Sequence, residues 1–297
     1  MQVRWDNSSR RGSVRPMSPR QRSGAIVCPS CGRLVEVSEP KCPYCGRARP
    51  GLFGFVGLLQ RLGDDLGFSA IVVGSCIIAY GLMLWFDPSG IQNGGLLGFL
   101  SPSTQAMFVF GASGSVPMFE AGRWWTPFSA GLLHGGLLHL FFNMMSLRNL
   151  APGVAHLYGP GRMVMIFTGS SVLGFLASSG VNLLHIPIPG LQGGQLTLGA
   201  SAGICGLLGA LIYYGRRTGN RYIKSQTWNW ILPLLAFGFF MRGIDNWAHI
   251  GGFAGGWLLA MWLDPLREER PDHVLVAIVC LVASLGAVVV SVVTAIL

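Results

Sequence analysis

Charged residues are scarce in this 297-residue chain, where Asp, Glu, Lys and Arg make up only 11% of the sequence. A typical soluble domain carries roughly 25%. No charged residue of these four types occurs between residues 163 and 215, whereas hydrophobic residues make up 51% of the chain and glycine occurs 43 times. So little charge excludes a soluble globular domain of ordinary composition and indicates a membrane protein.

A cleavable signal peptide is also missing from the sequence as given. Residues 1–24 are rich in Arg, Ser and Pro and contain no apolar run, so we expect a disordered basic tail there. Residues 51–68 are expected to form a juxtamembrane linker. The chain therefore divides into a basic head and a long apolar remainder.

Seven apolar stretches are long enough, at about 15 to 24 residues, to cross a roughly 30 Å hydrocarbon core as helices. The second of them carries Arg148 and Pro152 and has the weakest pattern. We therefore predict an all-α polytopic membrane protein. The predicted spans cover residues 69–86, 136–157, 162–180, 199–215, 228–243, 245–263 and 273–296.

Lys and Arg are unevenly shared between the two sets of loops that seven spans define. With a cytoplasmic N-terminus, 19 of the 21 basic residues lie on the cytoplasmic side, and only Arg123 and Arg242 lie outside. This distribution follows the positive-inside rule. We predict a multi-pass protein of a bacterial cytoplasmic membrane, since nothing resembles an organellar transit peptide apart from the Arg/Ser-rich start.

Four cysteines form two C-x2-C pairs within residues 25–50: Cys28 with Cys31, and Cys42 with Cys45. Two such pairs provide the four thiolates of a tetrahedral zinc site. The alternative is two disulfides in an oxidising compartment, and the predicted cytoplasmic location favours the metal. We expect a structural zinc ribbon that binds a cytoplasmic protein or the inner tail of a substrate. Nucleic acid is the weaker alternative, because the ribbon has few basic residues.

Four polar residues stand out within the apolar spans, where polar side chains are costly and often mark function. His139 and Asn143 are four residues apart and share one helix face. Ser201 and His249 lie near the starts of the fourth and sixth spans. Even-numbered spans all begin on the outer side, so Ser201, His249 and His139 lie within roughly 3 Å of one depth. This coincidence predicts a single cavity that opens outward.

Each of these residues also has a purely structural interpretation. A membrane serine often bonds the carbonyl one turn back, a lone histidine often packs, and an asparagine can join two helices. Taken together they provide a catalytic set, with Ser201 as nucleophile and His249 as base. His139, Asn143 and the backbone N–H of Ser201 are candidate oxyanion donors, and Gly199 leaves space around the hydroxyl.

Three ordered motifs within residues 69–263, "HGGLLHLFFNM", "GASAGICGLLGA" and "AHIGGFAGG", resemble those of the rhomboid family of intramembrane serine proteases. The resemblance implies a six-helix core with a Ser201–His249 dyad and with His139 and Asn143 at the oxyanion. It also implies that glycines pack the sixth span against the fourth. Residues 264–297 then form a linker and a seventh span, as in variants with an extra helix.

The chain departs from the family pattern at two positions. The family often has Arg directly after its tryptophan pair, where this chain has Thr126, with Arg123 upstream. It frequently has an aromatic residue four positions after the serine, where this chain has Cys205. The anchoring of the outer loop and the orientation of His249 are therefore open. Asp245 either caps the helix of His249 or orients the imidazole.

These residues predict an intramembrane serine endopeptidase that cleaves single-span proteins in the bilayer and needs no cofactor for the reaction. An inactive rhomboid-like adaptor or chaperone is the main alternative, and it would be expected to lack the serine or the histidine. A soluble α/β-hydrolase does not account for the charge-free flanks. A transporter with a zinc-ribbon sensor is the weakest alternative, because it would need a set of charged or ion-binding residues at mid-membrane, and the sequence shows no such set.

Overall fold

The computed structural model describes residues 23–28, 32–51, 65–94, 98–184, 192–240 and 243–297. The chain divides into two compact units, residues 1–63 and residues 64–297. Most of the predicted tail (1–24) and most of the predicted linker (51–68) lie outside the described residues. The two units are considered separately below.

The first unit contains a short antiparallel pair of strands, β1 (Ala25–Val27) and β2 (Leu34–Glu36), in which Ile26 lies opposite Val35. Alternation puts Ile26 and Val35 on the same buried face of this pair. Their side chains form a small core with Cys28, Val37 and Cys42. A core of this size cannot stabilise a domain without a disulfide or a metal.

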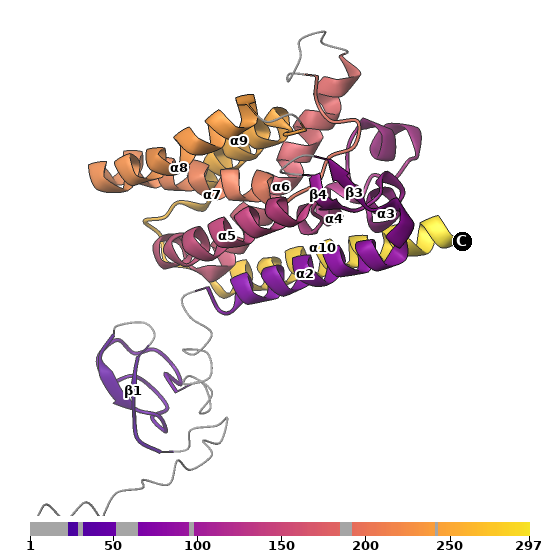
Figure 1. Ribbon diagram of the computed structural model, residues 1–297. Helices are drawn as coiled ribbons and strands as arrows, with labels where there is room; N and C mark the ends of the chain where they lie inside the picture. Colours follow the sequence, from indigo (N-terminus) through magenta and orange to yellow (C-terminus); the bar gives the residue numbers. More distant parts are fainter. Residues whose placement is uncertain (1–22, 29–31, 52–64, 95–97, 185–191, 241–242) are drawn as a thin grey trace, which may run out of the picture. The chain divides into compact units, whose positions relative to one another are not determined.

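The described residues of the second unit form seven long helices and, between the first two of them, a segment of short elements (Figure 1). Each of the seven predicted spans overlaps one long helix, although residues 241–242 of the fifth span lie outside the described residues. The long helices are α2 (Phe68–Phe86), α5 (Leu137–Tyr158), α6 (Pro160–Leu183), α7 (Ser201–Thr218), α8 (Arg221–Phe240), α9 (Asn246–Leu263) and α10 (Pro271–Ile296). The short elements are η2 (Pro88–Gly90), β3 (Gln92–Gly94), β4 (Gly98–Ser101), α3 (Thr104–Phe110), η3 (Val116–Glu120), α4 (Thr126–Ser129) and η4 (Ala130–Leu132).

Three of the described helices, α2, α6 and α10, are individually long and apolar enough to cross a membrane. A fourth crossing results if the segment from Thr126 to Leu132 and α5, which meet at 92°, are taken as one broken span. The helices α7 and α8 are less apolar because they carry exposed charged residues, Arg216 and Arg217 in α7 and Arg221 and Lys224 in α8. Pro152 lies inside α5, which continues past it to Tyr158.

The centre of the bundle is formed by α6, α7 and α9, and glycines set how closely these helices approach. A Cβ atom on Gly252 of α9 would overlap the carbonyl of Ala202 in α7. A Cβ atom on Gly256 would overlap the backbone of Gly206, one turn further along both helices. Small residues at such contacts allow direct backbone packing in membrane helices. The starts of α7 and α9 are thereby held side by side.

We expect Gly256→Ala to lower the thermal unfolding midpoint in detergent, because the added methyl group must push α9 away from α7. Overpacking of this kind costs about 1–3 kcal/mol. Gly286→Ala in α10 is the matched control, since nothing lies within 4 Å of a Cβ atom at that position. Alanine favours helix over glycine by about 1 kcal/mol, so this control should unfold no earlier than wild type. Equal midpoints for Gly256→Ala and wild type would contradict this account.

Candidate active site

Ser201 is the first residue of α7 and is half-buried at the end of the loop that precedes this helix. Gly199, two residues earlier, has φ +128°, a conformation that favours glycine. Its N–H donates to the carbonyl of Ala130 at 2.9 Å. The N–H groups of the first helical turn have no partner within the helix. The loop therefore presents the Ser201 hydroxyl beside backbone donors.

His249 lies in the first turn of α9, and its Nε2 atom is 2.8 Å from Oγ of Ser201. This is hydrogen-bonding distance for a base that takes the proton of a serine hydroxyl. For that role Nε2 must be the unprotonated nitrogen, with the hydrogen on Nδ1. The contact between Ser201 and His249 thus links the N-terminal ends of α7 and α9, which the glycines of α9 allow to lie close together.

Asp245 caps the N-terminus of α9. Its Oδ1 accepts a hydrogen bond from the N–H of Ala248 at 3.0 Å, and its Oδ2 accepts one from Oγ of Ser178 in α6. Ser178 Oγ also accepts from the N–H of Gly194, in the loop before α7, at 2.8 Å. Of the two roles open to Asp245, capping is the one that the structure shows. The carboxylate also connects α9 to α6 and to the loop that leads to Ser201.

His139 and Asn143 lie on one face of α5, and the ring of His139 reaches Gly199. A Cβ atom on Gly199 would lie 2.7 Å from Nε2 of His139 and 3.6 Å from Oγ of Ser201. Nδ1 of His139 accepts from the N–H of Gly135 at 3.4 Å, which leaves the hydrogen on Nε2, toward the serine. Asn143 donates one amide hydrogen to the carbonyl of His139 at 2.9 Å. The structure thus brings His139 close to the serine.

Two buried residues to which the sequence patterns assign no role are Arg123 and His134. Arg123 donates to the carbonyls of Phe108 at the end of α3 and of Ser291 in α10. It thereby anchors the segment that follows the short helices, while Thr126 Oγ1 donates back to the Arg123 carbonyl at 2.9 Å. The signal in the sequence is a single arginine in an otherwise charge-poor segment directly before two tryptophans.

His134 is the second of these residues. It is fully buried, and its ring meets that of His139 edge-to-face at a centroid distance of 5.1 Å. Such packing restricts the rotation of the His139 ring. Cys205 is buried in α7 one turn after Ser201, as expected of a packing residue.

The first unit holds a separate cluster of thiols. The Sγ atoms of Cys28, Cys42 and Cys45 lie within 4.8 Å of one another, and those of Cys28 and Cys45 are 3.8 Å apart. The fourth predicted ligand, Cys31, lies outside the described residues. Sulfur atoms bound tetrahedrally at 2.3 Å from a zinc ion are about 3.8 Å apart. The spacing of the three thiols fits such an ion.

The backbone around the two cysteine pairs is arranged in the same way. In each pair the N–H of the first cysteine donates to a carbonyl five residues later, Arg33 for Cys28 and Arg47 for Cys42, at 2.8 Å. The glycine that follows each pair has positive φ and donates to the carbonyl of the first cysteine at 2.9 Å. The described backbone on either side of the two pairs is therefore equivalent, and the thiols of Cys28, Cys42 and Cys45 lie close together.

Comparison with known proteins relates the helical unit to one family. A family model described as a rhomboid domain matches residues 121–265. The chain is 33% identical over 171 residues to the rhomboid protease GluP of Bacillus subtilis (strain 168), across 57% of this chain and 30% of that protein. It is 30% identical over 153 residues to YdcA of the same organism, a provisionally assigned rhomboid protease, across 50% of this chain and 72% of that protein.

A plant relative differs in its described activity. The inactive RHOMBOID-like protein 8 of Arabidopsis thaliana is 30% identical over 181 residues, which cover 59% of this chain and 49% of that protein. Similarity at this level therefore includes proteins described as proteases and a protein described as inactive.

Substitutions of Asp245 test whether its capping contact contributes to the stability of the protein. We expect Asp245→Ala to lower the unfolding midpoint, since loss of an N-cap costs about 1 kcal/mol and Ser178 loses its acceptor as well. Asp245→Asn keeps one oxygen for the N–H of Ala248 and should unfold between wild type and the alanine variant. If the asparagine and alanine variants unfold at the same temperature, the capping contact does not contribute measurably.

Proposed function

Because the chain belongs to the rhomboid family, we propose that it is a serine endopeptidase that hydrolyses peptide bonds in or near the transmembrane segments of membrane proteins. The observation that supports this most directly is the 2.8 Å distance between Ser201 Oγ and His249 Nε2. A serine that is activated by a histidine base requires this pairing of hydroxyl and imidazole. A serine that serves only packing does not require it.

The proposed reaction begins with the attack of Ser201 Oγ on the substrate carbonyl carbon, while His249 Nε2 takes the hydroxyl proton. The resulting oxyanion is stabilised by the N–H of Ser201, by Nε2–H of His139 and by the free amide hydrogen of Asn143. The imidazolium then gives its proton to the leaving amine, and an acyl-enzyme remains. Water, deprotonated by His249, hydrolyses the ester and restores Ser201. No cofactor enters these steps.

The proposed substrates are single-span membrane proteins with a helix that unwinds readily near one membrane surface. A regular helix keeps its carbonyls in hydrogen bonds, so helix-breaking residues in the substrate favour access to the scissile bond. The distribution of basic residues supports an N-terminus in the cytoplasm and a site that opens to the outer side of a bacterial cytoplasmic membrane.

For the first unit we propose a structural zinc ion held by Cys28, Cys31, Cys42 and Cys45. The fit of the described thiol distances to tetrahedral coordination supports it. The ion would replace the large core that this small unit lacks. Its surface is then available to a cytoplasmic protein or to the inner tail of a substrate.

Covalent labelling with a fluorophosphonate tests the protease proposal. We expect detergent-solubilised wild type to be labelled, and both Ser201→Ala and His249→Ala to lose the label, because the hydroxyl is a weak nucleophile without its base. Circular dichroism provides the control that the variants remain folded. If folded wild type is not labelled, an inactive protein that binds transmembrane segments becomes the better explanation.

Substitution of one cysteine tests the zinc proposal. We expect purified wild type to contain about one zinc ion per chain by elemental analysis, and Cys45→Ser to lose it, because structural zinc needs all four ligands. Tyr44→Ser, at an exposed neighbouring residue, is the matched control and should keep the metal. Hydrolysis of a model substrate should continue in Cys45→Ser. Zinc retained in that variant would contradict the proposal.

A further inference from the structure

The last helix, α10, makes polar contacts with the segment that leads to the active site. Ser291 of α10 is 0% exposed, whereas Val289, two residues earlier, is 61% exposed. Oγ of Ser291 accepts a hydrogen bond from Nε1 of Trp125 at 3.0 Å. Its backbone carbonyl accepts one from Nη2 of Arg123. Near its C-terminal end, α10 therefore contacts α3 and α4 (Figure 1).

Arg123 is 5% exposed and has no carboxylate partner among the residues that the structure describes. Its guanidinium instead donates to carbonyls at the end of α3, those of Phe108 and Val109, and to the Ser291 carbonyl. The C-terminal end of a helix carries partial negative charge, so α3 and α10 together stabilise the buried cation. Separating the two helices would leave this charge without part of its hydrogen bonding.

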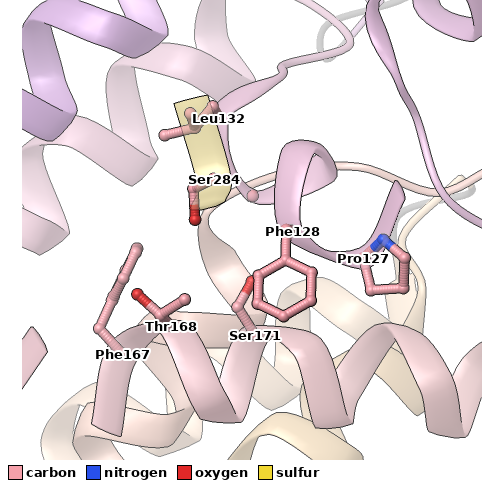
Figure 2. A pocket seen from close by; sticks show the side chains of 8 residues that line it. Pro127, Phe128, Leu132, Phe167, Thr168, Ser171 and Ser284 are labelled. Atoms are coloured by element: carbon pink, nitrogen blue, oxygen red, sulfur yellow. The ribbon is translucent and has the colours of Figure 1, made fainter. Parts of the chain in front are cut away.

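A second contact lies two turns earlier on the same face of α10. Ser284 of α10 and Thr168 and Ser171 of α6 line a small pocket together with Phe128 and Leu132, and Figure 2 shows their hydroxyl groups at its wall. Ser171 Oγ is buried and has no hydrogen-bond partner in the described structure. The pocket is about large enough for one water molecule, to which these hydroxyls would offer hydrogen-bond partners.

The segment 123–132 connects these contacts to the nucleophile. Ser129 Oγ donates to the carbonyl of Gly111 at 2.6 Å, which fixes α4 against the end of α3. The carbonyl of the next residue, Ala130, accepts the N–H of Gly199 at 2.9 Å. Gly199 precedes Ser201 by two residues. Two hydrogen bonds, Trp125–Ser291 and Gly199–Ala130, together with the backbone of residues 125–130 between them, thus connect α10 to the loop that holds the serine.

We propose that α10 is a positioning element of the active site. It holds the segment 123–132 through Ser291 and through the hydroxyl-lined pocket at Ser284, and that segment holds Gly199 and, through it, Ser201. This inference rests on the proposed function, because it concerns the reactivity of that serine. It gives the seventh helix a role in catalysis in addition to membrane anchoring.

Trp125→Phe and Ser291→Ala provide the test, because each removes one partner of the same hydrogen bond and leaves the rest of the contact in place. We expect each to lower the rate constant of fluorophosphonate labelling about two- to tenfold, the range of one hydrogen bond. The double variant should be no slower than either single variant. Ser284→Ala, which removes a hydroxyl from the pocket, should also label more slowly. Turnover of a peptide substrate should show the loss in kcat rather than KM.

Val289→Ala is the matched control, since it removes methyl groups from an exposed position two residues from Ser291. It should label at the wild-type rate. All rates are measured well below the unfolding midpoint of each variant. Unchanged labelling rates with lowered midpoints would show that α10 contributes stability alone and would overturn the proposal, as would additive losses in the double variant. If wild type itself is unlabelled, the protease function fails first, and this proposal fails with it.

Discussion

The close approach of α7 and α9 is the constraint on which the site depends. Gly252 and Gly256 allow the backbone of α9 to lie directly against Ala202 and Gly206. Since Ser201 and His249 begin these two helices, the same contact fixes the distance between hydroxyl and imidazole. A single methyl group at the interface would separate the helices by a large fraction of the 2.8 Å that joins the two side chains. The packing of α7 against α9 therefore also determines the distance between Ser201 and His249.

Several buried polar groups near the helix starts have partners within the protein, as a low-dielectric surrounding favours. The carboxylate of Asp245 accepts hydrogen bonds from Oγ of Ser178 and from the N–H of Ala248. Oγ of Ser178 in turn accepts one from the N–H of Gly194. Arg123 is surrounded by carbonyls. Each of these groups joins at least two segments that are far apart in sequence. Moving a loop away from its helix would leave a buried polar group without a partner, which is unfavourable, so these hydrogen bonds hold the loops to the helices.

Much of this arrangement could be predicted from the sequence, because apolar length and charge-free runs mark helices directly. The seven predicted spans all overlap long helices, and small residues around Ser201 and His249 indicate where the helices meet. The roles of Arg123 and Ser178 could not be predicted in this way. Their partners, Ser291 and Asp245, are 168 and 67 residues away, and no local pattern encodes such pairs. Cys31 and the sulfur geometry around it remain a prediction from spacing.

The two helix starts that form the site have opposite effects on the proposed reaction. At the start of α7, backbone N–H groups and the helix dipole favour negative charge, which suits an oxyanion next to Ser201. At the start of α9 the same dipole disfavours the positive charge that His249 gains when it takes a proton. The carboxylate of Asp245, held in the cap position of that helix, offsets this effect. In the proposed reaction, a Ser–His pair without a hydrogen-bonded acid would therefore be sufficient, since Asp245 supplies negative charge from the cap position of α9.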